Sequence, residues 1–116
     1  MLGKNGRSLT VAAQMAEFKM LIGILQLELR IGDALNLRDK RKFLRSLKDR
    51  WHHHHNVSVA EVDYQEHPQH AVVGVVLAGS DAKQMESTLS KLVDSVRKDR
   101  YAELQDFRIE IVSGRD

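Results

Sequence analysis

A run of basic residues between positions 38 and 48 is the part of this sequence best suited to chemistry. Five of them recur at intervals of three and four residues: Arg38, Arg41, Lys42, Arg45 and Lys48. On a helix such intervals bring side chains to one face, so they predict a contiguous basic stripe. A row of guanidinium and ammonium groups can neutralise RNA phosphates. The opposing interpretation is a solvated helix face, although like charges this close repel one another and cost helix stability.

Lys40 does not belong to this stripe. It falls between Leu37 and Leu44, inside the apolar arc of the same segment. Its stem could lie on the core with the ammonium group in water, or the ammonium group could pair with a carboxylate elsewhere in the domain. A third interpretation gives Lys40 a role in a functional site, and we favour the first two over it.

Four consecutive histidines, His52 to His55, suggest a metal site at first sight. His52 and His55 could share a helical face, and His67 and His70 could approach from a neighbouring turn. Metal ligands, however, are usually spaced and oriented by partners rather than placed in an uninterrupted run. We therefore interpret the run as a solvated helix end or loop, and predict no metal site and no cofactor.

The sequence offers little for catalysis. It has no cysteine, which excludes disulfides and thiolate-held metal clusters. It also lacks a nucleophile elbow and a glycine-rich phosphate loop. We expect a protein that is not an enzyme.

The periodicity of the first half predicts a strand followed by the basic helix. Leu25, Leu27, Leu29 and Ile31 alternate with polar residues, which indicates a strand with one buried face within residues 21–31. Gly32-Asp33 breaks it, and Asn36 is a good N-cap for a helix running to Trp51. The apolar arc of this helix consists of Leu37, Phe43, Leu44, Leu47 and Trp51.

The second half predicts a hairpin, a helix and a last strand. Residues 57–64 and 70–79 are valine-rich strands around a turn that contains Pro68. Ser80 or Asp81 then caps a helix with an apolar stripe over residues 82–96, and Phe107, Ile109 and Ile111 alternate in a final strand. This βαββαβ order predicts a ferredoxin-like α+β fold: a four-stranded antiparallel sheet with two helices on one face.

The uncovered face of such a sheet can bind RNA by stacking bases on aromatic side chains. Only Tyr64 and Phe107 are candidates here, and we assign Phe107 to the core. The charged residues Glu28, Arg30, Arg108 and Glu110 are expected on that face instead. Recognition of RNA by base stacking on the sheet is therefore disfavoured.

The succession of a strand ending LELRI, the basic helix from Leu37, and the strand NVSVAEVD at residues 56–63 resembles the YlxP-like family of small bacterial proteins of unknown function. The resemblance covers about residues 20–112 and implies the same fold. Members typically begin near Met20, and their genes often lie beside those of translation initiation and ribosome-maturation factors. It therefore implies an association with RNA or the small ribosomal subunit.

Length and composition are those of one soluble domain. The chain has 116 residues, of which 42% are hydrophobic and 29% charged. Residues 1–19 are expected to be an N-terminal extension, flexible or forming a short helix, and residues 20–116 a single domain. No run approaches the roughly 20 apolar residues of a membrane helix, so we expect a cytoplasmic protein without a membrane partner.

The net charge of +2 conceals two oppositely charged regions. Residues 36–55 hold seven Lys and Arg against two Asp, whereas residues 56–82 hold four acidic residues and no Lys or Arg. We expect an accessory factor that contacts RNA through the basic helix. The alternative is a protein-interaction module, a homodimer or adaptor that uses the acidic hairpin and the open sheet. A small-molecule or metal sensor is a third possibility.

Overall fold

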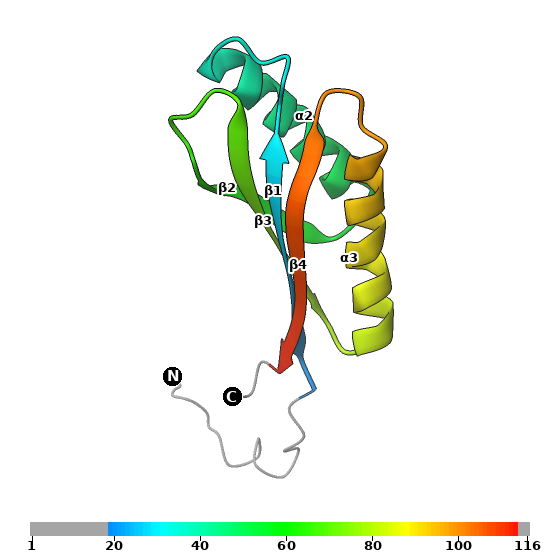
Figure 1. The fold of residues 1–116 in the computed structure, drawn as a ribbon. Coiled ribbons are helices and arrows are strands. Elements are labelled where there is room, and N and C mark those ends of the chain that lie inside the picture. The colour runs from blue at the N-terminus through cyan, green and yellow to red at the C-terminus, as the bar shows by residue number, and fades with distance from the viewer. Residues whose placement is uncertain (1–18, 114–116) are drawn as a thin grey trace.

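The structure, a computed structural model, describes residues 19–113 (Figure 1). Six elements follow one another: β1 (Leu21–Arg30), α2 (Leu37–His54), β2 (Val57–Asp63), β3 (His70–Gly79), α3 (Ala82–Arg97) and β4 (Glu103–Ser113). The predicted βαββαβ order is confirmed. The predicted extension over residues 1–19 lies, apart from Lys19, outside the described residues.

The four strands form one antiparallel sheet in the order β2-β3-β1-β4. The central strand β1 pairs along its whole length with β3 and with β4, so that Leu27 lies between Val73 and Phe107. The outer strands β2 and β4 each have one neighbour. This is the strand order of a ferredoxin-like α+β domain, as expected from the sequence.

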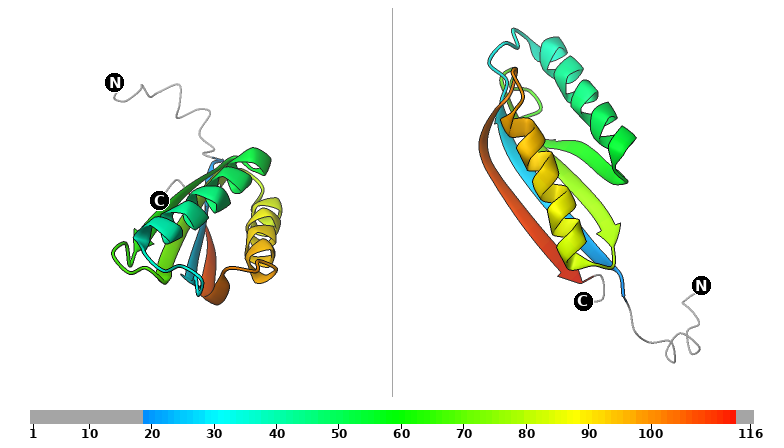
Figure 2. Two further views of the ribbon diagram at one scale, coloured as in Figure 1. Left: turned by 90° about the horizontal axis from the view of Figure 1, so that it is seen from above. Right: turned by 90° about the vertical axis from the view of Figure 1, so that its right-hand side faces the viewer.

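Both helices cover the same face of the sheet (Figure 2). A Cβ atom added to Gly23 would lie 3.1 Å from Leu89 of α3, which places α3 on the Gly23 side of β1. Leu47 of α2 lies beside Val59 and Val73, and Val73 pairs with Leu27, on the same side as Gly23. The predicted placement of the two helices on one face is confirmed.

The core lies between this face and the two helices. From β1 it takes Leu25, Leu27 and Leu29, all fully buried, which confirms the predicted alternation. From α2 it takes Leu47 and Trp51, and from α3 it takes Met85, Leu89, Leu92, Val93 and Val96. The indole Nε1 of Trp51 donates to Ser95 Oγ at 3.3 Å and thereby links the two helices.

Two boundaries differ from those predicted. Helix α2 continues through His54, one turn beyond Trp51, and ends where His55 N–H donates to the Trp51 carbonyl at 2.8 Å. Strand β4 begins at Glu103, well before Phe107, and its register against β1 shifts between Glu28 and Leu29, which marks a β-bulge. That bulge changes the phase of the alternation and conceals the first half of the strand in the sequence.

Phe107 is not a core residue, contrary to the prediction. It faces the helices but lies at the periphery, with 39% of its surface exposed. The guanidinium carbon of Arg97 lies 5.2 Å from the centre of its ring, in a cation–π contact at the end of α3. The ring is covered by a charged side chain in place of apolar ones.

Candidate nucleic-acid interface

The start of α2 is fixed by its capping residues. The Asn36 side chain accepts a hydrogen bond from Asp39 N–H at 2.9 Å, and the Asp39 carboxylate accepts one from Leu35 N–H at 2.9 Å. Asn36 therefore is the N-cap that the sequence predicted. These bonds fix which residues begin the helix, and hence which side chains point to the core and which to solvent.

All five residues of the predicted basic stripe are exposed on α2: Arg38, Arg41, Lys42, Arg45 and Lys48. None of them forms an ion pair with another residue in the range 19–113. Two other cations of the same helix are paired: Lys40 with Glu61, and Arg50 with Asp99 at 3.5 Å. The stripe therefore keeps its charges available to a partner.

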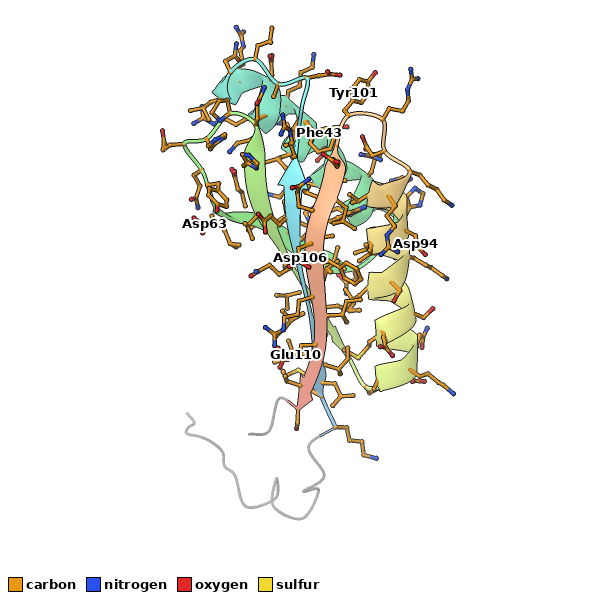
Figure 3. The ribbon with its side chains drawn as sticks, viewed as in Figure 1. Phe43, Asp63, Asp94, Tyr101, Asp106 and Glu110 are labelled. Carbon is orange, nitrogen blue, oxygen red and sulfur yellow. The ribbon has the colours of Figure 1, made fainter. Side chains whose placement is uncertain are left out.

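The structure divides the stripe between two flanks of α2. Arg41, Arg45 and Lys48 line a groove beside β2, and we call these three the groove cations. Lys42 lies on the other flank, in a hollow of about 400 Å³. Phe43 and Tyr101, both labelled in Figure 3, also line this hollow. Arg38 lies one turn before Arg41 and Lys42 and lines neither the groove nor the hollow.

The groove between α2 and β2 has a volume of about 270 Å³. Apolar side chains form much of its wall: Leu44, Leu47, Val59 and Val73. Ala60 and Glu61 of β2 complete it, and the groove cations lie along its α2 side. The site thus combines positive charge with a partly apolar surface next to an edge strand.

Lys40 points into the domain and is fully buried. Its ammonium Nζ lies 2.6 Å from Glu61 Oε2, an oxygen that has no other hydrogen-bond partner within residues 19–113, and 18% of the Glu61 side chain is exposed. Nζ also donates to the backbone carbonyls of Tyr64 at 2.7 Å, His70 at 3.0 Å and Gln65 at 3.4 Å. Pairing with a carboxylate was one of the two favoured interpretations and is confirmed, whereas exposure of the ammonium group to water is wrong.

The contacts of Lys40 with Glu61 and with the carbonyls of Tyr64, Gln65 and His70, which we call the Lys40 clamp, hold an unusual backbone conformation. Tyr64 has φ of 60°, in the left-handed region that a bulky residue rarely adopts. Its carbonyl is the closest of the three that accept from Lys40. The Tyr64 ring lies near His67 and His70, whose own ring centres are 4.5 Å apart. The hairpin turn is therefore fixed to α2 by one buried cation.

The histidine run does not build a metal site in the part of the chain that the structure describes. His52, His53 and His54 are exposed on the last turn of α2, and among the described residues the ring contacts of the run are edge contacts between neighbouring histidines. No group of three His, Cys, Asp or Glu side chains suited to a metal ion occurs within residues 19–113.

Within residues 19–113, the opposite face of the sheet carries no helix. This face carries, as expected, the charged residues Glu28, Arg30, Arg108 and Glu110. On β1, Glu28 and Arg30 alternate with the buried leucines. On β4, Arg108 and Glu110 pair with β1 residues of that same face. Figure 3 shows Asp106 and Glu110 along β4 and Asp63 at the end of β2. On the β2–β3 side this face is apolar, and Val62 and Val76 are about half exposed.

Sequence reasoning found the cations but missed the groove that three of them line. The groove depends on how far α2 stands from β2, which no local pattern encodes. It also missed the left-handed Tyr64, because neither Tyr nor its neighbours give a signal for that conformation.

No helix between residues 19 and 113 is long and apolar enough to cross a membrane.

These observations define a class: a small ferredoxin-like α+β domain with one basic helix packed over an edge strand. Residues 22–109 match the family described as "Protein of unknown function (DUF503)". The chain is also 29% identical, over 85 residues, to the "Uncharacterized protein YlxP" of Bacillus subtilis (strain 168). That match covers 73% of this chain and 90% of its relative. The chain belongs to the DUF503 family.

Proposed function

We propose that this protein is a non-enzymatic, cytoplasmic accessory factor that binds RNA, free or within the small ribosomal subunit, through the basic stripe of α2. One observation carries the proposal: the groove cations share one flank of α2 and make no ion pair within residues 19–113. The paired cations of the helix, Lys40 and Arg50, have structural partners, whereas the groove cations have no ion-pair partner within the described residues. Phosphates would relieve their mutual repulsion.

The proposal is tested by the dependence of RNA affinity on salt. For single strands, the slope of log K against log salt is about −0.7 per neutralised phosphate. Replacing Arg41, Arg45 and Lys48 together by Gln should therefore reduce the slope by about 2. These side chains point away from the core, so the melting temperature should change little.

A control separates a local effect from the change in net charge. A variant with Lys83, Lys91 and Lys98 replaced by Gln loses the same charge from α3 and its C-cap, where all three are exposed. Lys42→Gln removes the stripe cation of the other flank and should reduce the slope by about 0.7 if that flank also contacts phosphate. Binding that is insensitive to salt, or equally weakened by the α3 variant, would leave the stripe as a solvated helix face.

A second candidate function is self-association through the open face of the sheet. The observation that favours it is the exposed apolar surface on β2 and β3, where Val62 and Val76 are 51% and 47% exposed. Apolar surface of this kind often meets a partner. A homodimer through this face would leave the basic stripe, on the other side of the sheet, free for RNA.

A further inference from the structure

The groove beside the basic helix has features that phosphate binding alone does not require. Its volume of about 270 Å³ lies below the roughly 300–1,000 Å³ of pockets for drug-sized ligands. Its apolar wall includes Leu44 from α2 and Val59 from β2. A groove of this size and character suits one flat, partly apolar ring system, such as a nucleobase.

The neighbouring strand adds hydrogen-bonding groups. β2 is one of the two outer strands and, within residues 19–113, pairs only with β3. Alternate backbone N–H and C=O groups of an edge strand point away from the sheet. Those of β2 lie next to the groove, where Ala60 contributes to its lining. They can pair with the donors and acceptors on the edge of a base.

The charges of the groove favour an anion. Glu61 is the one acidic residue in its lining, and Lys40 already lies 2.6 Å from its carboxylate. The three groove cations therefore remain as its uncompensated charge. A fitting ligand carries negative charge for α2, a flat ring for the apolar wall and polar edges for β2.

From these three features we infer that the groove between α2 and β2 binds unpaired nucleotides of RNA, with phosphates on the groove cations and a base against Val59. This inference rests on the proposed function and deepens it. Duplex RNA is disfavoured as the ligand, because its bases are paired and stacked and cannot enter the groove.

Two other occupants fit less well. A second copy paired through β2 would bring two basic stripes together, and like charges would oppose the contact. An extended acidic peptide could pair with β2. Its alternate side chains, however, would place carboxylates on the apolar wall, which costs free energy.

The test uses fluorescence anisotropy with three probes and two matched variants. The probes are an oligouridylate of about eight nucleotides, a duplex RNA of about sixteen base pairs, and an oligoglutamate peptide as competitor. Val59→Gln places a neutral polar side chain in the groove. Val62→Gln makes the same change on the same strand but on the open face, where Val62 is 51% exposed.

The parent should bind the single strand more tightly than the duplex at equal salt. Val59→Gln should weaken single-strand binding about fivefold or more without changing the salt slope, and Val62→Gln should leave it unchanged. Circular dichroism and thermal melting establish that each variant is folded. Should Val59→Gln fail to fold, Val59→Thr, of nearly equal volume, provides the same polar change.

The outcomes separate the inference from the function on which it rests. If no probe RNA binds, or binding ignores salt, the proposed function fails and the inference fails with it. If the duplex binds as tightly as the single strand with a steep salt slope, and both valine variants behave alike, the function stands and the inference is overturned. Oligoglutamate that competes as well as oligouridylate would make the groove a peptide site and overturn it too.

Discussion

Replacing Lys40 by Met keeps an unbranched side chain of similar length in the core but removes the cation at its end. Glu61 Oε2 then loses the ammonium group at 2.6 Å, and the carbonyls of Tyr64, Gln65 and His70 lose their donor. All four acceptors belong to β2, β3 and the turn between them. The substitution therefore detaches the hairpin from α2 without altering the basic stripe.

The expected loss can be worked out from this geometry. Removing one partner of a buried ion pair costs about 3–5 kcal/mol. Because 18% of the Glu61 side chain is exposed, water can partly solvate the stranded carboxylate, and we expect a value near the lower end, about 3 kcal/mol. For a small domain this is a large part of the total stability of about 5–15 kcal/mol. The melting temperature should fall by about 12–24 °C.

Urea unfolding followed by circular dichroism measures the loss, and a double-mutant cycle assigns it. Glu61→Gln in the Lys40→Met background removes the stranded charge, so the double variant should be more stable than Lys40→Met alone, with a coupling of about 1–3 kcal/mol. Lys48→Met is the matched control on an exposed position of the same helix, and should change stability by less than about 0.5 kcal/mol. A Lys40→Met variant as stable as this control would show that the clamp does not stabilise the fold.

Two further predictions concern the other end of β3 and the open face. Gly79→Ala should lower the free energy of unfolding in urea by about 1–3 kcal/mol, because the added Cβ would lie 2.8 Å from Met85 Sδ. The control Gly32→Ala should leave it unchanged, because a Cβ there meets nothing within 4 Å. Equal effects of the two substitutions would contradict this packing. In sedimentation equilibrium we expect the parent to self-associate and Val76→Asp to abolish this self-association. Leu35→Asp, a control at an 84% exposed residue of the β1–α2 loop, should not affect it. A parent that stays monomeric at high concentration would exclude the dimer.

The sequence predicts most of this fold because the apolar residues keep the period of the element that contains them. The alternation of Leu25, Leu27 and Leu29 matches one buried face of β1. Prediction fails for β4, where the bulge separates Leu104 from Phe107 by three residues although both face the helices. A period-2 pattern cannot survive such a change of phase.

The candidate site could be predicted only in part, for a related reason. Intervals of three and four predict that the five stripe cations lie on the exposed side of one helix, and they do. The same intervals cannot say which flank faces an edge strand, so they do not separate Lys42 from the groove cations. They also cannot identify Glu61 as the partner of Lys40, because that pairing depends on where the hairpin lies across the sheet.

The cations of α2 therefore divide by the partners that the fold gives them. Lys40 is used inside, where it holds the hairpin and with it the position of β2 relative to α2. Arg50 joins the end of α2 to Asp99, just after α3. Both contacts orient the helix, and the groove between α2 and β2 depends on that orientation. A rigid groove favours the binding of a small flat ligand, because little free energy is then spent on ordering the side chains of the protein. Under the proposed function, replacing Lys40 should therefore weaken RNA binding through the position of β2, since Lys40 itself is buried away from the groove cations.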